Sequence, residues 1–401
     1  MTVARRVNDS LIDVLYLERR IDPYVRPTFD RVFRKSIVAL AQAGINARRR
    51  DPALGLAEER LVAHEDEITR SIVETMSQFT HQTYDDAPPA ERAGNSKTYG
   101  VVRGELEVLD GLADRVRQGL FATSRSYPAW IRFAGPGPRT PPDMKDNGVV
   151  SIGIKVCGVE GPKLLDDEAA TQDFTGISAP TFTTPNVTEN LRLQKHILRG
   201  TPLFYFLGPR HPHLGDAVMQ GAYAKTQLNP LQERYWSCAS YLLGPGQAMH
   251  YSIIPRTALD TRLPRHPGPD YLRQAMAATL AERGVEFDLA VQLQTDPHRM
   301  PIEHDGVEWP ERLSPFVPVA RLRVPAQRFD SPAQLAFANN LSYNPWHSLA
   351  DHRPLGNQNR ARKAIYSELS RLRQRMNHAD HVEPTGAEVF PDPEDAADSH
   401  A

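Results

Sequence analysis

The segment that most constrains this chain is a helical stretch near its C-terminal end, from Asn357 to about Arg375. It contains no Gly or Pro and is rich in Ala, Arg, Leu and Glu, which favour a helix. Pro354 and Gly356 stand directly before it and are typical of a loop. The sequence therefore predicts one regular helix here, preceded by a turn.

Three polar residues share one face of this predicted helix. Arg362, Tyr366 and Arg373 are spaced at i, i+4 and i+11, which puts them on the same side. A free tyrosine has a pKa of about 10, so a phenolate at neutral pH needs a strong positive charge nearby, which Arg362 can supply. A phenolate is a hard anionic ligand for ferric iron, and tyrosine is one of the axial ligands of haem. Taken alone, Arg-x-x-x-Tyr also occurs by chance on surface helices, with a solvated arginine beside a half-buried tyrosine.

The surrounding residues carry a resemblance to a known family. Asn344-Pro-Trp-His347 and Arg353-Pro-Leu-Gly356 are similar to the compact bacterial catalase-like branch of the haem catalase superfamily, which includes catalase-related peroxidases and allene oxide synthase-like proteins. In that superfamily, Arg-x-x-x-Tyr followed seven residues later by Arg holds the haem. The resemblance implies haem b with ferric iron, Tyr366 as its axial ligand, Arg362 holding the phenolate, and Arg373 at a propionate.

Further segments extend the resemblance over roughly residues 92–377. Trp130-Ile-Arg-Phe-Ala134 is similar to the family strand whose arginine meets a haem propionate, which carries that role onto Arg132. The stretch from Asp146 to Gly161 resembles the next barrel strand, and the stretch from Gln292 to Glu303 follows the small catalase-like proteins. Several motifs in the family's order are more specific than any one of them.

The chain departs from the family at two positions above the iron. The family has a distal histidine three residues after an arginine, but the run from Arg92 to Gly100 carries Asn95 at that place. The family's distal asparagine, two positions before a proline, is replaced by Ser178 in Ser178-Ala-Pro-Thr-Phe182. The resemblance therefore implies Asn95 and Ser178 as the catalytic residues, with Arg92 at the haem edge and Phe182 lining the pocket.

These two replacements bear on the expected reaction. A histidine with a pKa near 6.5 can take and return a proton during peroxide cleavage, which is typically worth about 10² to 10⁴ in rate. An amide can form hydrogen bonds but cannot carry the proton. We expect weak or no catalase activity, and a haem-dependent oxidoreductase or lyase/isomerase that cleaves or rearranges an organic substrate with an O–O or N–O bond. Allene oxide synthases of the family perform such a hydroperoxide rearrangement.

Several alternatives stay open at this stage. The chain could be a haem peroxidase that uses H2O2 or organic peroxides, or a non-catalytic haem sensor or carrier. His81, in Phe79-Thr-His-Gln-Thr-Tyr84, could replace Asn95 as the distal residue, but this register leaves the matches at Arg92 and Gly100 unused. Asn95 also lies next to Gly94, a pair typical of turns.

The pattern along the chain predicts an α+β fold, a catalase-like antiparallel β-barrel with an N-terminal helical arm, helical insertions and a C-terminal haem-ligand helix. Short β-like runs separated by long connections favour such a barrel over a doubly wound sheet. The domain boundaries are expected at 1–90 for the arm, 91–380 for the barrel and 381–401 for an acidic tail, which we expect to be disordered. The expected strands are Gly100–Val108, Ala129–Phe133, Val149–Val156, Met249–Ile254, Val285–Leu293 and Val317–Val324, with an insertion helix over Asp270–Glu282.

The composition narrows the partners and the compartment. With 47 Lys and Arg against 49 Asp and Glu, the formal charge of -2 gives no overall attraction to nucleic acid or an anionic membrane. Cys157 and Cys238 are too few for a disulfide scaffold or a zinc site. The N-terminus has no hydrophobic signal region, and no apolar run is long enough to span a bilayer. We expect a cytoplasmic protein that binds a small organic substrate, with no nucleic-acid or membrane partner and with a homo-oligomer left open.

The other histidines give weaker patterns. His211 and His213 lie in a Pro-rich loop, where two histidines are more often surface or satisfied core groups than metal ligands. His347 and His352 both lie shortly before the start of the predicted haem-ligand helix. We expect these two to be structural hydrogen-bonding residues.

Overall fold

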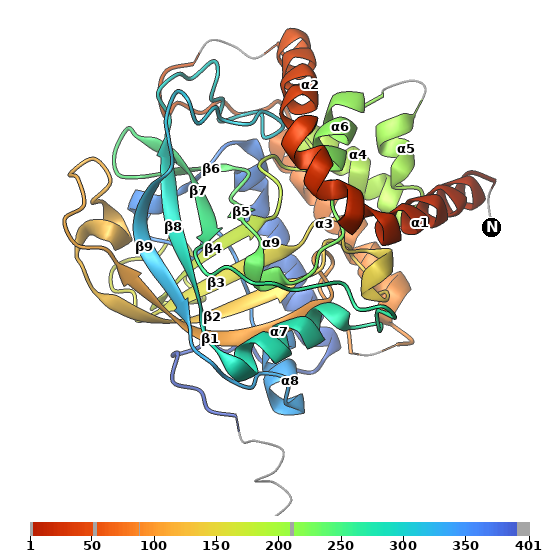
Figure 1. The fold of residues 1–401 in the computed structure, drawn as a ribbon. Helices are drawn as coiled ribbons and strands as arrows, with labels where there is room; N and C mark the ends of the chain where they lie inside the picture. The colour runs from red at the N-terminus through yellow and green to blue at the C-terminus, as the bar shows by residue number, and fades with distance from the viewer. Residues whose placement is uncertain (1–2, 51–53, 88, 209–211, 391–401) are drawn as a thin grey trace, which may run out of the picture.

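A computed structural model describes residues 3–50, 54–87, 89–208 and 212–390 (Figure 1). Its centre is one antiparallel sheet that closes into an eight-stranded barrel in the order β7-β5-β4-β3-β2-β1-β9-β8, because β8 also pairs with β7. β6 and β10 extend the sheet beyond β7. The strands are β1 (Thr98–Val108), β2 (Ser126–Ala134), β3 (Ser151–Cys157), β4 (Thr171–Ile177), β5 (Tyr235–Trp236), β6 (Ser240–Leu242), β7 (Ala248–Pro255), β8 (Val285–Leu293), β9 (Val317–Val324) and β10 (Pro354–Leu355). The expected α+β barrel architecture is confirmed.

Figure 1 shows α1 to α6 gathered on one side of the barrel, with α7 and α8 near its lower end. α9 packs against α3 and α4 through a buried cluster that includes Ile72, Val187, Ala361 and Ile365. None of the helices in the described residues is long and apolar enough to cross a membrane. The helices are α1 (Val3–Val32), α2 (Arg34–Arg48), α3 (Glu65–Tyr84), α4 (Val187–Leu198), α5 (Leu203–Leu207), α6 (Leu214–Tyr223), α7 (Tyr271–Glu282), α8 (Pro332–Asn340) and α9 (Asn357–Met376).

The alternation of side chains along each strand separates the barrel interior from its outer wall. In β2, Ile131 and Phe133 point into the main core, and full burial of each contributes about 1.5–3 kcal/mol. Their neighbours Trp130 and Arg132 therefore point outward. Trp130 packs there in a separate cluster with residues of α8. The outer wall of β2 thus carries the buried Arg132, one of the residues of the predicted haem site.

The start of α9 is fixed by a glycine and an acidic residue. Gly356 has φ +86°, which L side chains rarely adopt, and a Cβ on it would collide with the carbonyl oxygen of Ile302. Glu303 accepts hydrogen bonds from the Asn357 backbone N and Nδ2, both at 2.8 Å. A carboxylate at a helix N-terminus is favourable because the first backbone N–H groups have no partner within the helix. The axial position and rotation of α9 are therefore tied to the loop after β8.

The structure bears out most sequence-based elements and corrects others. All six predicted strands, the insertion helix and the C-terminal helix are present within a few residues of the expected bounds. β4, the helices α4 to α6 and α8 were not predicted. The expected disorder of the tail does not describe residues 381–390, where Glu388 accepts a hydrogen bond from Trp130 Nε1 at 2.6 Å and Phe390 packs on the Trp130 ring. Residues 391–401 lie outside the described residues.

Candidate functional site

Tyr366 and Arg362 form a hydrogen-bonded pair on the face of α9 that packs against the protein. The Nη2 of Arg362 donates to the Tyr366 phenol oxygen at 3.1 Å, and the guanidinium carbon lies 4.9 Å from the centre of the tyrosine ring. The same Nη2 donates to Thr175 Oγ1 on β4 at 2.8 Å. The pair is thus held between the helix and the outer wall of the barrel, one helical turn apart as the sequence predicts.

Arg362 is built to remain charged. Burial alone would lower its pKa, but the nearby oxygens of Tyr366 and Tyr241 outweigh burial and raise the pKa above its usual value. Its Nη1 donates to Asn359 Oδ1 at 2.8 Å, while Nε is buried without a hydrogen-bond partner. Arg362 therefore places a fixed cation next to the phenol oxygen of Tyr366.

Arg92, Arg132 and Arg373, which we call the arginine triad, come together from distant parts of the chain. Arg92 precedes β1, Arg132 lies on β2, and Arg373 lies two turns beyond Tyr366 on α9. Arg92 and Arg373 both donate to the carbonyl oxygen of Leu341. Burial, followed by repulsion from Arg92, lowers the pKa values of both Arg132 and Arg373 well below normal.

The arginine triad lacks a matching negative charge among the described residues. Among the described residues, its hydrogen bonds go to backbone carbonyl or hydroxyl oxygens, and none goes to a carboxylate. Glu91 is the acidic neighbour that acts on all three, but burial raises its pKa and so weakens its anionic form. Arg92 Nη1 and Arg373 Nε are buried without a partner. Because buried charges are normally paired, this cluster has the chemistry of an anion site.

The two residues expected above the iron are held differently. Asn95 has φ +48°, the left-handed conformation that asparagine tolerates, and its carbonyl oxygen accepts from Arg132 Nη2 at 2.8 Å. The buried Ser178 accepts from the Val150 backbone N at 3.0 Å. Phe182 donates its backbone N–H to the Asp305 carbonyl at 2.9 Å. Among the described residues, no hydrogen bond joins the side chain of Asn95 or Ser178 to Tyr366.

The rival distal residue, His81, lies in an exposed position. Its side chain is 49% exposed near the end of α3, and its Nδ1 is 2.8 Å from Asp85 Oδ1. A solvated hydrogen bond on a helix surface is an ordinary role for such a histidine. The geometry gives no support to His81 as a group over a buried cofactor.

A cavity of about 90 Å³ opens beside Tyr366, well below the roughly 300 Å³ or more of usual ligand pockets. It lies between α9 and the loop that joins α8 to η4 (Ala350–His352). On that loop, the Tyr343 ring packs so close to Gly153 of β3 that a Cβ there would lie 2.9 Å from it. The lining residues include Ser342, Tyr343, Asn344, His347, Tyr366, Ser367, Ser370 and Gln374.

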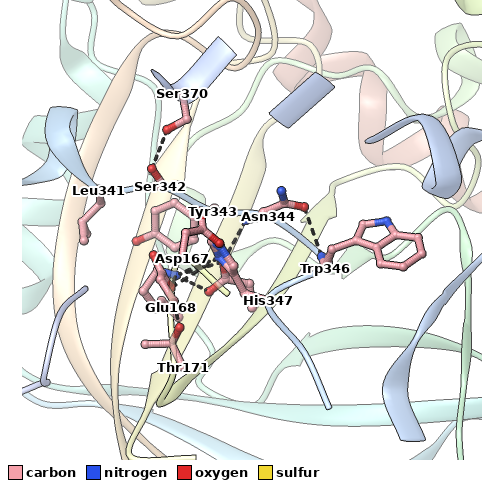
Figure 2. Close-up of polar contacts among 12 residues, drawn as sticks. Asp167, Glu168, Thr171, Leu341, Ser342, Tyr343, Asn344, Trp346, His347 and Ser370 are labelled. Carbon is pink, nitrogen blue, oxygen red and sulfur yellow. Dashed lines mark hydrogen bonds and ion pairs between the residues drawn. The ribbon is translucent and has the colours of Figure 1, made fainter. Parts of the chain in front are cut away.

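The same loop is anchored by a buried network of charges. His347 Nδ1 lies 2.9 Å from Asp173 Oδ2, and its Nε2 lies 3.1 Å from Asp167 Oδ1. Lys155 is fully buried and pairs with both Glu168 and Asp173. Figure 2 shows His347 beside Asp167 and Glu168, with the Ser342–Ser370 hydrogen bond tying the loop to α9. Burial and Lys155 would lower the pKa of His347, but its bonds to the two aspartates raise it to about 9.

Glu168, Asp173 and His347 have the residue types of a metal site, with ligand atoms within 4.8 Å of one another. The Lys155 ammonium lies 2.8 Å from Asp173 and also pairs with Glu168, so it already supplies the compensating cation. Protonated His347 supplies a second positive charge. We therefore interpret this group as a structural ion network, consistent with the structural role expected for His347. His352 is structural as well, since Leu120 N donates to its Nε2 at 2.9 Å.

Neither Tyr343 nor the charged partners of His347 are identified by the sequence pattern. A signal was present, because Lys155 stands in an otherwise apolar strand and lysine is almost never fully buried without a partner. The identity of those partners depends on long-range packing and has no local pattern. Of the two histidines in the Pro-rich loop at 210–213, His213 pairs with Glu189 and Asp216. His211 lies outside the described residues.

Comparisons with solved structures identify the fold. A fungal catalase superposes with a TM-score of 0.59 at 13% identity, covering 86% of this chain and 70% of that chain. Catalase A from Saccharomyces cerevisiae gives 0.58 at 12%, covering 86% and 72%, and a bacterial catalase gives 0.55 at 14%, covering 88% and 76%. No family model matches the sequence, and no curated protein matches it. At these identities the chain is shown to have a catalase-like fold, as expected.

Proposed function

We propose that this protein is a haem-dependent enzyme with weak or no catalase activity, which cleaves or rearranges a small organic substrate with an O–O or N–O bond. The observation that carries the proposal is the bonded pair of Arg362 and Tyr366 on a helix that also bears Arg373 of the arginine triad. The catalase-like fold supports it at the level of architecture.

The residues on this side of the barrel fit a haem group chemically. Tyr366 offers one hard anionic ligand, and the arginine triad offers charge for two propionates, including the partnerless Arg92 Nη1 and Arg373 Nε. Seven residues of helix between Tyr366 and Arg373 span about 10 Å, comparable to the separation of the metal and the propionate edge in a haem. The cavity beside Tyr366 is smaller than a porphyrin. Binding therefore requires the loop that carries Tyr343 to move away from Gly153.

Each residue then has a defined task. When bound, ferric haem supplies a redox-active, Lewis-acidic iron. Arg362 would hold the Tyr366 oxygen as an anion, Arg92, Arg132 and Arg373 would fix the propionate edge, and Phe182 would line the pocket of the haem-bound protein. Asn95 orients the reacting oxygen of the substrate by hydrogen bonding, and Ser178 contributes a hydroxyl.

The same residues argue against rapid catalase turnover. Near neutral pH an imidazole can gain and lose a proton, whereas the amide of Asn95 and the hydroxyl of Ser178 keep the same protonation state. The Ser178 oxygen also accepts the Val150 N–H, so part of its bonding capacity is used by the backbone. An organic substrate whose weak bond breaks without such a proton transfer is the better match.

The test is a stopped-flow optical spectrum of the haem-loaded protein mixed with H2O2 and, separately, with a fatty-acid hydroperoxide. We expect inertness to H2O2 and consumption of the organic hydroperoxide. Rapid oxygen release or oxidation of a one-electron dye with H2O2 would favour a catalase or peroxidase instead. Binding of cyanide without turnover of either peroxide would favour a haem sensor or carrier.

A further inference from the structure

α1 exposes its apolar face to solvent, which is the reverse of an ordinary surface helix. Its polar residues Asn8, Asp22 and Arg26 are buried against the protein, whereas most of its apolar residues face solvent. The partly buried exceptions are Ile12, Tyr16 and Phe29. Val14 is 63% exposed, Ile21 60% and Tyr24 83%. A surface helix normally buries its apolar face, because this is where most of its stabilisation comes from.

Specific polar contacts fix this rotation. Asn8 Oδ1 accepts from the Leu203 N–H at 3.1 Å, and Asp22 Oδ2 accepts from the Thr226 N–H at 2.6 Å. Arg26 Nη1 donates to the Ala224 carbonyl at 2.7 Å and its Nη2 to the Ala222 carbonyl. These bonds lie along 19 residues of the helix, so turning the apolar face inward would break all of them. These hydrogen bonds therefore hold the apolar face of α1 outward.

That face is continuous along the helix. At about 100° per residue, the exposed valines and isoleucine of α1 fall within an arc of roughly 40°, flanked by exposed Leu11, Leu17 and Tyr24. Glu18 is the charged residue inside the wider apolar arc. Arg6, Arg20 and Arg31 follow along one border, where Asp13 is the acidic neighbour. The residues of the narrow arc are Val3, Val7, Val14, Ile21, Val25 and Val32.

The charge of this region is opposite to that of the remaining chain. The first 50 residues contain 11 Lys or Arg and 5 Asp or Glu, a net charge of +6, of which α1 accounts for +1 and residues 33–50 for +5. The whole chain has -2, and the remainder therefore has -8. An asymmetry of this kind is typical of proteins that bind polyanions or anionic membranes. Arginines bordering a wide apolar face are typical of helices that lie in the plane of a membrane interface.

We infer that the outer face of α1 binds the surface of an anionic lipid bilayer. The valines, Ile21 and the leucines would enter the boundary between headgroups and acyl chains, while Arg6, Arg20 and Arg31 meet lipid phosphates. The contact holds the protein on the membrane without crossing it. This departs from the expectation of no membrane partner, which rested on an overall charge that conceals the basic N-terminal region. The inference does not depend on haem or on the proposed reaction.

A second copy of the chain is the rival occupant, and the charges disfavour it. Two α1 faces would bring together two helices whose exposed side chains each carry a net charge of +2, and like charges oppose association. The exposed charged residues of α1 are Arg5, Arg6, Arg20, Arg31, Asp13 and Glu18. An anionic bilayer instead attracts each arginine, typically strengthening binding about five-fold per residue at low salt.

The experiment is co-sedimentation of the full chain with vesicles of phosphatidylcholine alone or mixed with an equal amount of phosphatidylglycerol. We expect binding to the mixed vesicles, much weaker binding to the neutral ones, and loss of binding as sodium chloride is added. The double variant V14D/I21D should bind at least roughly ten-fold more weakly, since it places two charges on the inserted face. Both side chains are exposed, so the fold should be retained.

Two comparisons make the outcome decisive. R20Q and R31Q should each weaken binding about five-fold at low salt, while the matched control L61D, at a 74% exposed leucine outside α1, should bind like the wild type. Equal sedimentation of V14D/I21D and wild type, or no binding to either vesicle, overturns the inference. Light scattering that shows a dimer dissociated by V14D/I21D, without vesicle binding, assigns the face to a second copy instead.

Discussion

Arg132 donates to the carbonyl oxygen of Asn95 at 2.8 Å, joining an arginine of the triad to the backbone of the residue that we propose for the distal position. Arg132 also donates to Thr98 Oγ1 from both Nε and Nη2, at 3.1 and 2.8 Å. The turn that carries Asn95 is thereby held against β2. Side-chain changes at residue 95 can alter the chemistry there while the backbone anchor stays in place.

Asn95→His should raise catalase activity by about 10² to 10⁴ if residue 95 faces the iron, the usual worth of a general acid–base group. Histidine is among the residues enriched in the left-handed conformation that Asn95 adopts, so the turn should survive. Oxygen release from H2O2 measures the gain, with His81→Gln as a control that changes nothing. An unchanged rate in Asn95→His would mean that this residue does not lie over the iron.

Tyr366→Phe should abolish the native haem spectrum, because the ring is kept and the ligand oxygen is lost. Tyr343→Phe is the matched control on the opposite wall of the cavity, since the Tyr343 hydroxyl donates only a long 3.4 Å bond to the Trp130 carbonyl. Optical spectra of both variants after haem loading compare them directly. An unaltered spectrum in Tyr366→Phe would refute the ligand assignment.

Arg373→Met should have opposite effects with and without haem. In the haem-free protein it relieves repulsion within the arginine triad and removes a poorly compensated buried charge, so we expect equal or greater stability than in the wild type. Loss of one arginine from a charge-paired propionate should weaken haem binding by about 2–5 kcal/mol. Thermal unfolding and haem titration measure the two changes. Arg375→Met, at an exposed position on the same helix, should alter neither.

The His347 network should stabilise the protein at low and neutral pH and weaken in alkali. The pKa of His347 is raised to about 9 in the folded protein, against about 6.5 when unfolded. Its contribution is therefore complete below about pH 6.5 and is lost as the pH rises through about 9, a change on the order of 3 kcal/mol. Urea unfolding of wild type and His347→Gln across this range isolates the effect. His213, whose pKa is also raised to about 9, should still contribute in the variant.

Gly356→Ala should destabilise the fold by about 1–3 kcal/mol, because the added Cβ needs a φ that alanine disfavours and meets the Ile302 carbonyl oxygen. Gly221→Ala provides the control, since no atom lies within 4 Å of a Cβ placed there. Chemical denaturation compares the two free energies of unfolding. Equal stability would show that the start of α9 can shift without cost.

Local patterns sufficed for the elements that carry their own signal. α9 combines helix-favouring composition with Pro and Gly before it, and strands such as β8 and β9 show long apolar alternation. β4 was missed because Asp173 and Gly176 interrupt its pattern, and its strand geometry comes from pairing with β3. β5 and β6 have only two and three residues, so their partners define them. Family motifs pointed to the arginine triad, but the loop bearing Tyr343 and His347 is positioned by contacts that no local pattern encodes.

The segment 381–390 completes the outer wall of β2 by covering Trp130 with Glu388 and Phe390. In chain order this cover is about 250 residues later than the strand it protects. During synthesis β2 therefore emerges from the ribosome long before its cover exists, and the part of Trp130 that Glu388 and Phe390 contact stays uncovered until then. Nascent chains at that stage present an apolar surface to chaperones and to one another. Slowing translation before residue 381 should consequently raise aggregation, with no change in the stability of the finished protein.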